Sequence, residues 1–271
     1  MITDKKIGII GCGNMGTALL IGLSKVLEKS VSIMVSELDA SKRAAIQEKH
    51  KIIVEIDNNY LVKYSDVIIL AVKPQDLENV LRQEVCCGIS EEKLLISIAA
   101  GITTTYIESV VGGSIPVIRA MPNMPAIIGK AVTAISAGSA AAKRDIELAR
   151  KIFSTVGDVV EVDEKLMDAV TAISGSGPAY FFYLIEALAE AAEKLGLDKK
   201  TAEELAIKTA IGSSELLDKL KEHPGLLRKR VASKGGTTEA ALKVFEDKSL
   251  KRIIEEAATA ACKRSKELSK G

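Results

Sequence analysis

Short runs of Ile, Val and Leu recur along the first part of the chain, and each is apolar on both faces instead of at alternate positions. The runs lie at residues 7–10, 31–35, 52–54, 66–72, 94–98 and 116–120. Helix-forming stretches separate them. Strands that are apolar on both faces are typical of a parallel sheet that helices cover on both sides. The pattern therefore predicts an α/β fold with a doubly wound, mainly parallel sheet, which the runs at 131–135 and 158–162 extend.

The chain changes in character after Glu164. From Pro178 onward it is rich in helix-forming residues, with Asp198 as a plausible cap. Helices are predicted over 180–195, 201–220, 238–245 and 249–268, with a turn at 223–225. The sequence thus predicts a Rossmann-like dinucleotide-binding domain over 1–163 and an all-α domain over 164–271. Ala-rich helices form a thin core, so we expect a partner subunit to supply the missing burial.

A glycine-rich loop follows the first apolar run. Its sequence, Gly11-Cys12-Gly13-Asn14-Met15-Gly16, fits the G-x-G-x-x-G pattern of dinucleotide-binding loops, and it lies between a predicted strand and a predicted helix. Gly11 permits the tight turn, Gly13 allows the pyrophosphate to approach the backbone, and Gly16 allows the helix to pack closely. We interpret all six residues as cofactor-binding, the alternative being a tight turn with incidental glycines. Cys12 is interpreted as a residue without a specific role between two glycines, although a redox sensor is another interpretation of a thiol at a helix start.

Further cofactor residues are expected where strands end, because ligands of doubly wound sheets bind at the carboxyl ends of the strands. These residues are Ser36 and Glu37, then Ala71, Val72, Lys73 and Pro74, then Ala99, Ala100 and Gly101. An acid such as Glu37 usually bonds the ribose 2′-hydroxyl of NAD and repels the 2′-phosphate of NADP. Ser36, Lys42 and Arg43 could instead bind that phosphate, and Glu37 could simply cap the next helix. The choice between NADH and NADPH stays open.

The charge balance argues against several classes of function. The chain has 37 Lys and Arg against 36 Asp and Glu, a net charge of +1, so no basic surface for nucleic acid is expected. No run approaches the roughly 20 apolar residues of a membrane span. The four cysteines lack the spacing of a metal site. We expect a cytoplasmic protein with free thiols, no bound metal, no nucleic-acid partner and no membrane contact.

Few residues could transfer a proton. Both histidines, His50 and His223, lie in segments that are expected to be solvated. Carbonyl reductases of the 3-hydroxyacid dehydrogenase group carry a lysine shortly after a Gly-Ser-Gly segment, and the matching position after Gly175 is Phe181. A carbonyl substrate needs such an acid, whereas an imine can carry its own proton near neutral pH. The sequence therefore favours an imine substrate.

Five segments occur in an order that is typical of one family. They are the glycine loop, Ala-Val-Lys-Pro-Gln at 71–75, Arg-Ala-Met-Pro-Asn-Met-Pro at 119–125, Ile-Ser-Gly-Ser-Gly-Pro-Ala-Tyr at 173–180 and Val-Ala-Ser-Lys-Gly-Gly-Thr-Thr at 231–238. In these segments, over almost its whole length, the chain resembles the pyrroline-5-carboxylate reductases. The last segment is the most specific of the five.

The resemblance implies NADPH or NADH as the cofactor and reduction of 1-pyrroline-5-carboxylate to L-proline, the last step of proline biosynthesis. It makes the C-terminal all-α domain a dimerisation and substrate-binding domain, with a homodimer and a decamer of dimers as the assemblies. It implies that Thr238 is the catalytic residue, hydrogen-bonded to the ring nitrogen of the substrate. The residues that it implies for substrate binding are Glu164, Ser233, Gly236, Thr237 and Thr238, and it implies that Asn58 lies near the adenosine of the cofactor. Arg230 and Glu37 depart from the pattern of many members.

Two other functions remain as alternatives. The first is a reductase of another cyclic imine or a small acid on the same fold, which assays with those substrates would distinguish. The second is a non-catalytic regulator that senses NAD(P), which would bind the cofactor without consuming it. Phe181 argues against a 2-hydroxyacid substrate, and the segment 233–238 argues against the regulator.

Overall fold

The computed structural model describes residues 2–27, 32–50 and 52–268. The chain divides into two compact units. The first unit comprises Met1–Ser176 together with Ala260–Gly271, and the second comprises Gly177–Thr259. Among the described residues, no helix combines the length and the apolar character that crossing a membrane requires.

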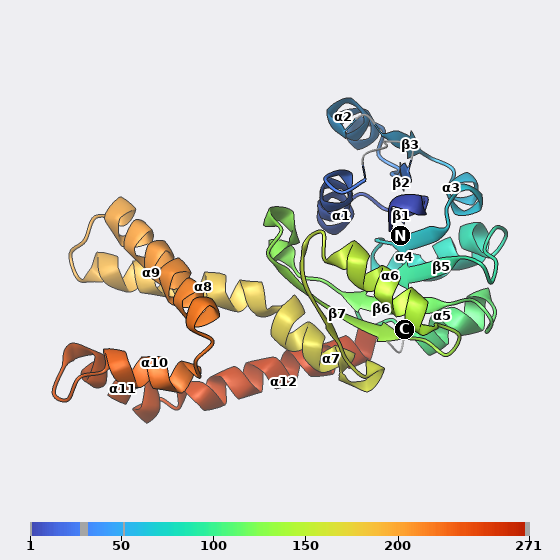
Figure 1. The fold of residues 1–271 in the computed structure, drawn as a ribbon. Coiled ribbons are helices and arrows are strands. Elements are labelled where there is room, and N and C mark those ends of the chain that lie inside the picture. Colours follow the sequence, from blue (N-terminus) through green and yellow to red (C-terminus); the bar gives the residue numbers. More distant parts are fainter. Residues whose placement is uncertain (1, 28–31, 51, 269–271) are drawn as a thin grey trace. The chain divides into compact units, whose positions relative to one another are not determined.

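The first unit is built on one eight-stranded sheet with the strand order β3-β2-β1-β4-β5-β6-β7-β8 (Figure 1). The strands are β1 (Ile7–Ile10), β2 (Ile33–Ser36), β3 (Ile53–Glu55), β4 (Val67–Leu70), β5 (Leu94–Ser97), β6 (Val117–Met121), β7 (Ala131–Ala137) and β8 (Gly157–Glu161). Strands β1 to β6 are parallel, β7 is antiparallel to β6, and β8 is parallel to β7. The predicted mainly parallel sheet is confirmed. Residue 31 of the predicted second strand lies outside the described residues.

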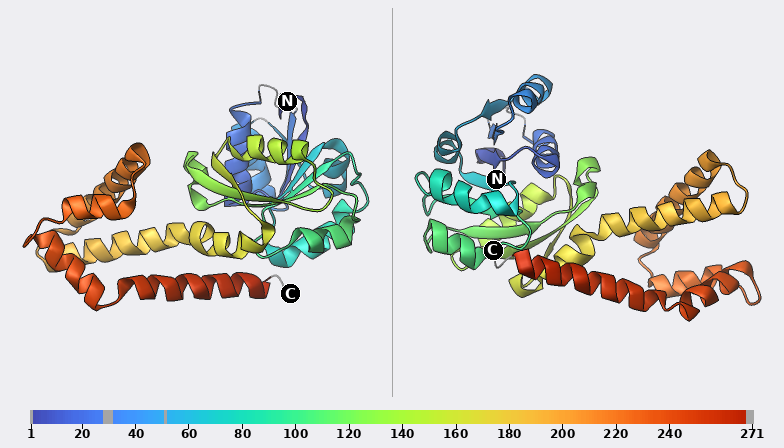
Figure 2. Two further views of the ribbon diagram at one scale, coloured as in Figure 1. Left: turned by 60° about the horizontal axis from the view of Figure 1, so that its bottom comes forward. Right: turned by 180° about the vertical axis from the view of Figure 1, so that it is seen from behind.

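Helices cover both faces of this sheet (Figure 2), as the apolar runs predict. Alternate residues of each strand point to opposite faces, so Ile69 belongs to one apolar core and Ile68 to the other. The first core includes side chains of α1 (Asn14–Ser24), α2 (Ala40–His50) and α6 (Lys143–Phe153). The second core includes side chains of α3 (Asn58–Tyr64), α4 (Pro74–Val80), η3 (Leu81–Val85) and α5 (Thr104–Val111). Two short turns of helix, η1 (Ile2–Asp4) and η4 (Met124–Ile128), complete this part of the unit.

The boundary between the compact units differs from the predicted domain boundary between residues 163 and 164. Residues 164–176 form η5 (Glu164–Leu166), α7 (Met167–Val170) and η6 (Thr171–Gly175), and they belong to the sheet unit. Met167 and Ala172 are buried there. The end of α12 (Leu250–Leu268) also belongs to the sheet unit, where Ser265 is buried. A side-chain hydrogen bond from Ser265 to Asp168 joins these two segments, and local sequence does not reveal this long-range contact.

The second unit is entirely helical, as predicted. It contains α8 (Gly177–Lys194), α9 (Lys199–Leu220), α10 (Pro224–Val231), α11 (Thr237–Asp247) and the first part of α12. The predicted cap of α9 is confirmed, because the Asp198 side chain accepts a hydrogen bond from the backbone N–H of Thr201. The prediction of only a turn at 223–225 is wrong: these residues begin α10. His223 Nδ1 accepts the N–H of Gly225, and Pro224 occupies the first position of the helix, where it needs no hydrogen-bond partner.

The second unit has little core of its own. In residues 177–259, all of which are described, only Gly177, Ala189, Ala202 and Ala206 are buried. Large apolar side chains are exposed instead, including Tyr183 of α8 and Leu195 after it. The thin core expected from the sequence is therefore observed, and these helices carry apolar faces that the rest of the unit leaves uncovered.

Candidate active site

The glycine loop lies where the order of the strands changes direction. The chain continues from β1 to β2 and β3 on one side, and β4 lies on the other side of β1. The loops after β1 and β4 therefore diverge at this point, which is the usual ligand site of an open α/β sheet. The backbone N–H of Gly11 donates to the carbonyl of Ser36 at 2.9 Å, and that of Ala71 donates to the carbonyl of Ile10 at 2.8 Å.

The glycines of the loop are required for different reasons. Gly11 has a φ of +95°, and a Cβ there would lie 2.8 Å from the carbonyl oxygen of Ala71. A Cβ on Gly16 would collide with the carbonyl oxygen of Gly11. Gly13 is different, because nothing lies within 4 Å of the position of its Cβ. The loop is thus tightly packed on its inner side and open at Gly13, which precedes the first helical residue of α1.

A hollow of about 380 Å³ opens beside this loop. Cys12, Gly13, Asn14, Thr17 and Lys42 are among the residues that line it. The first N–H groups of a helix have no partner within the helix and carry partial positive charge. The polar part of the hollow therefore combines the start of α1 with a lysine from α2, which suits phosphate, whereas apolar side chains such as Ile21 and Ile127 line the rest.

Four other predicted cofactor residues lie in the loop or next to it. Cys12 is buried, and this burial raises the pKa of its thiol, which argues against a reactive redox sensor. Its backbone N–H donates to Glu37 Oε2 at 3.3 Å, so the carboxylate of Glu37 lies against the loop. Ser36 is buried. Met15 is half-buried and packs against the first core.

The segments after β4 and β5 lie on the same side of the switch point. Ala71 and Val72 pack against Gly11, since the nearest atoms to a Cβ on Gly11 belong to them. Lys73 is exposed and Pro74 begins α4. Ala99 donates its backbone N–H to Ser97 Oγ at 3.3 Å. Gly101 has a φ of +82°, and Ala100 before it is half-buried.

Asn58 is a buried amide at the start of α3, the helix that follows β3. Its Nδ2 donates to the carboxylate of Glu84. Its Oδ1 has no hydrogen-bond partner among the residues that the structure describes. A buried acceptor without a partner is rare, because leaving it unsatisfied costs about 1–3 kcal/mol. Asn58 therefore has one acceptor that the described residues leave unsatisfied.

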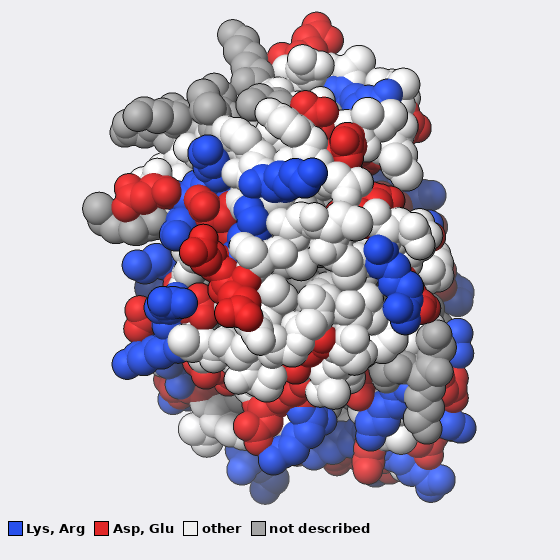
Figure 3. Space-filling view, turned by 90° about the vertical axis from the view of Figure 1, so that its right-hand side faces the viewer, with Lys and Arg blue, Asp and Glu red and all other residues white. Residues whose placement is uncertain are grey.

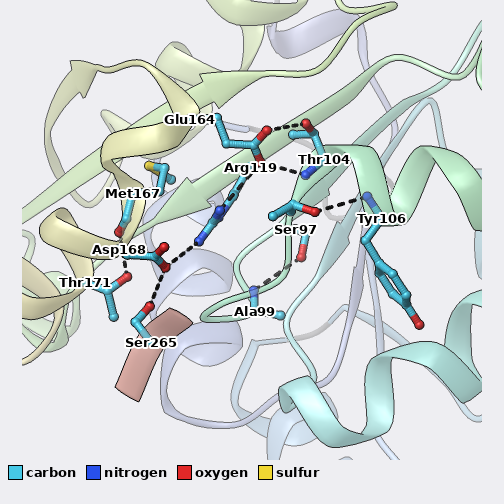
Figure 4. Close-up of polar contacts among 11 residues, drawn as sticks. Ser97, Ala99, Thr104, Tyr106, Arg119, Glu164, Met167, Asp168, Thr171 and Ser265 are labelled. Carbon is cyan, nitrogen blue, oxygen red and sulfur yellow. Dashed lines mark hydrogen bonds and ion pairs between the residues drawn. The ribbon is translucent and has the colours of Figure 1, made fainter. Parts of the chain in front are cut away.

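Glu164 belongs to a network of buried and half-buried polar residues that connects distant parts of the first unit (Figure 4). Its carboxylate accepts the backbone N–H of Thr104 at 2.7 Å and the Thr104 hydroxyl at 2.6 Å. Arg119 lies between Glu164 and Asp168, with nitrogen–oxygen distances of 3.6 Å to each. Ser265 then donates its hydroxyl to Asp168 at 2.7 Å.

Most of this network is not evident from the sequence. Arg119 is only 4% exposed, and a charged residue within the apolar run 116–120 was the signal that could have identified it. A buried arginine is stable only when it is paired, and its two acids come from the segment after β8. Thr104 and Ser265 gave no local signal, because their roles depend on contacts between residues that are far apart in the sequence.

The predicted substrate residues of the second unit form one turn. The N–H of Gly236 donates to the carbonyl of Ser233 at 3.0 Å, and Gly236 is the N-cap of α11, so Thr237 and Thr238 begin the helix. Ser233 and Thr237 are exposed, and Thr238 is half-exposed. One acid also contacts this turn, because Glu239 Oε2 accepts the N–H of Gly235 at 2.7 Å. The turn presents hydroxyl groups and helix N–H groups to a ligand.

The two histidines belong to other parts of the structure. His50 ends α2, and partial burial lowers the pKa of its imidazole. His223 caps α10 through its Nδ1. Neither residue belongs to the segments that form the loop or the turn.

The comparisons with known proteins agree with the motifs. A family model described as "Pyrroline-5-carboxylate reductase dimerisation" matches residues 164–268, and one described as "NADP oxidoreductase coenzyme F420-dependent" matches residues 6–101. A pyrroline-5-carboxylate reductase of Synechocystis is 41% identical over an alignment of 271 positions, which covers 98% of this chain and 98% of that protein.

Solved structures give the same result. A pyrroline-5-carboxylate reductase from Coxiella burnetii has a TM-score of 0.91 and 37% identity, and the match covers 98% of this chain and 99% of that one. A Plasmodium falciparum pyrroline carboxylate reductase with NADP bound has a TM-score of 0.88 and 30% identity, with coverage of 98% and 99%. These likenesses extend over both units and confirm the resemblance drawn from the five segments. The chain belongs to the pyrroline-5-carboxylate reductase family.

Proposed function

We propose that this chain reduces 1-pyrroline-5-carboxylate to L-proline with NAD(P)H, the last step of proline biosynthesis. The observation that carries the proposal is the open glycine loop at the β1–β4 switch point. The relatives that carry this enzyme's name match the chain over almost the whole length of both sequences. The cofactor is held in the first unit, and the proposed substrate turn is in the second.

The residues around the loop fit a nicotinamide dinucleotide. Gly13 leaves room for the pyrophosphate, because no atom lies within 4 Å of the position of its Cβ. The N–H groups at the start of α1 are suitable donors for that group. The free Oδ1 of Asn58 can accept a hydrogen bond from the adenosine part. The segments 71–74 and 99–101 are proposed to contact the rest of the cofactor.

The turn of Ser233, Gly236, Thr237 and Thr238 is proposed to bind the substrate. Its hydroxyl groups and the first N–H groups of α11 suit a small carboxylate. The hydroxyl of Thr238 is proposed to hydrogen-bond the ring nitrogen. For the reaction to occur, this turn, from the same chain or a second copy, must reach the cofactor that the loop holds.

The bound NAD(P)H supplies the hydride for the imine carbon. The chain's own residues bind and orient the reactants, and this can account for most of the rate enhancement because correct orientation can lower a barrier by about 7–11 kcal/mol. The substrate nitrogen carries its own proton as an iminium, so the proposed mechanism uses no titrating side chain. Thr238 holds that nitrogen in place through a hydroxyl that stays protonated throughout.

Glu164 remains a proposed substrate residue, but its carboxylate is already engaged. Thr104 donates two hydrogen bonds to it, and Arg119 lies 3.6 Å away. The side chain is about one-quarter exposed. We therefore propose that any contact with the substrate amine uses the exposed part of a carboxylate that Thr104 and Arg119 hold in place.

A homodimer is proposed as the functional unit, with a decamer of dimers as a higher assembly. The family description of residues 164–268 supports association between chains. The exposed apolar side chains of α8 and α9 offer a surface that a second copy can bury. Sedimentation of a stable monomer at assay concentrations would contradict this proposal. A cytoplasmic location is proposed on the basis of the family and the free cysteines.

The function is tested by mixing the purified chain with 1-pyrroline-5-carboxylate and reduced cofactor. We expect loss of NAD(P)H absorbance and formation of L-proline in equal amounts. Thr238→Ala should slow turnover about 10–1000-fold with little change in cofactor affinity, whereas Thr238→Ser, which keeps the hydroxyl, should restore much of the rate. Unchanged turnover in Thr238→Ala would remove this residue from the mechanism. Absence of any imine-dependent cofactor oxidation would refute the function.

A further inference from the structure

We infer that Glu37 makes this enzyme selective for NADH over NADPH, by fixing a carboxylate at the edge of the glycine loop where the ribose 2′-oxygen of the cofactor binds. The inference rests on the proposed function, since it concerns the cofactor of the same site. It also distinguishes this chain from the Plasmodium relative, whose structure holds NADP.

The carboxylate of Glu37 is held on the loop side by two backbone donors. Oε2 accepts the N–H of Cys12 at 3.3 Å, and Oε1 accepts the N–H of Asp39 at 3.0 Å. The backbone N–H of Glu37 donates to the carbonyl of Glu55 on β3, which continues the pairing of the two strands. The side chain therefore has a defined position next to the loop, at the end of the second strand.

The basic residues that could bind a 2′-phosphate are committed elsewhere. Arg43 Nη1 donates to the carbonyls of Glu37 at 2.9 Å and Leu38 at 2.7 Å, so its guanidinium holds the turn between β2 and α2. Lys42 lines the hollow beside Cys12, Gly13 and Asn14. That position suits the pyrophosphate, which NADH and NADPH share.

A second acid occupies the donors at the start of α2. The carboxylate of Asp39 accepts the N–H of Ser41 at 2.8 Å, the Ser41 hydroxyl at 2.5 Å and the N–H of Lys42 at 3.0 Å. These bonds lower the pKa of Asp39, the hydroxyl of Ser41 making the largest contribution. Its carboxylate is therefore charged at neutral pH. The helix terminus that could receive a phosphate already holds an anion.

NADH and NADPH differ only at the 2′-oxygen of the adenosine ribose. The 2′-hydroxyl of NADH can donate a hydrogen bond to the carboxylate of Glu37, whereas a 2′-phosphate brings a charge of about −1.5 to −2 next to two carboxylates. Like charges in close contact are strongly unfavourable. We expect NADH to bind at least about 30-fold more tightly than NADPH.

The test measures cofactor binding without substrate, by fluorescence titration of the full-length protein with NADH and with NADPH. Glu37→Gln keeps the shape and an acceptor oxygen but removes the charge, and it should reduce the preference for NADH about tenfold, mainly by strengthening NADPH binding. Glu55→Gln is the matched control, because it removes the same charge from the end of the neighbouring strand. Its preference should stay within about twofold of that of the unmodified protein.

Equal binding of both cofactors by the unmodified protein, or an unchanged preference in Glu37→Gln, would overturn the inference. Glu37→Ser serves as a second variant, and circular dichroism shows whether each variant is folded. Steady-state assays separate this inference from the proposed function. Selective NADH binding without reduction of 1-pyrroline-5-carboxylate would refute the function alone, and equal kcat/KM values for the two cofactors would refute the inference alone.

Discussion

Replacing Glu164 by Gln removes one negative charge from the network around Arg119 and leaves its shape almost unchanged. The amide oxygen of Gln can still accept the N–H of Thr104, but the amide nitrogen that replaces the second oxygen cannot accept the Thr104 hydroxyl. Arg119 keeps Asp168 as its remaining acid, at 3.6 Å. Because Arg119 is buried, it cannot replace the missing charge with water.

The loss of stability in Glu164→Gln can be estimated from the distance between Arg119 and Glu164. A nitrogen–oxygen separation of 3.6 Å gives an upper bound of about 4–5 kcal/mol at an effective dielectric constant of 20. The partial exposure of Glu164 and the remaining partner Asp168 reduce this value. Weakening the charge-assisted bonds from Thr104 adds to it, since such bonds contribute about 1.5–3 kcal/mol each. We expect Glu164→Gln to lower the free energy of unfolding by about 2–3 kcal/mol.

The assay is urea unfolding at one fixed protein concentration, because association between chains also affects stability. Glu161→Gln is the matched control: its carboxylate pairs with Arg150 at 3.1 Å, and both side chains are exposed. Exposed pairs contribute little, so this variant should lose less than about 1 kcal/mol. Equal losses in the two variants would refute the argument from burial. A higher KM for 1-pyrroline-5-carboxylate with unchanged stability would show that Glu164 acts mainly on the substrate.

Two further substitutions and one labelling experiment have clear expected outcomes. Gly13→Val fills the open side of the loop and should abolish NAD(P)H binding in a titration, and retained affinity would refute the loop assignment. Ser265→Ala removes the bond to Asp168 and should cost about 1–2 kcal/mol, with faster hydrogen exchange at the end of α12; unchanged exchange there would contradict it. Burial raises the pKa of the Cys12 thiol, so iodoacetamide should label the exposed Cys87 first at neutral pH, and Cys12 should react faster as the pH rises. Faster labelling of Cys12 at neutral pH would contradict this.

Residues whose role is local were predictable from the sequence. The apolar runs identified the strands of the parallel sheet, because burial on both faces leaves a clear pattern. The glycine loop was predictable because its backbone conformation and close packing admit few other residues, as Gly11 shows. Asp198 was found as a cap because capping depends on neighbours in the sequence.

Residues whose role depends on distant contacts were not predictable in this way. The antiparallel direction of β7 depends on pairing with β6. Residues 164–176 and the end of α12 belong to the sheet unit through contacts between distant parts of the sequence, such as the bond between Ser265 and Asp168. Arg119 carried a signal, an isolated charge in an apolar strand, but its two acids follow a different strand. On the face shown in Figure 3, basic and acidic side chains are mixed, as the near-zero net charge suggests.

The proposed function depends most on direct hydride transfer from the cofactor to the imine carbon of 1-pyrroline-5-carboxylate. Cofactor that carries deuterium at the transferring position of the nicotinamide C4 tests this step, with the proline product analysed by mass spectrometry and NMR. Direct transfer places one deuterium in each L-proline, on the ring carbon that formed the imine. Proline without deuterium, or no proline despite cofactor oxidation, would contradict it.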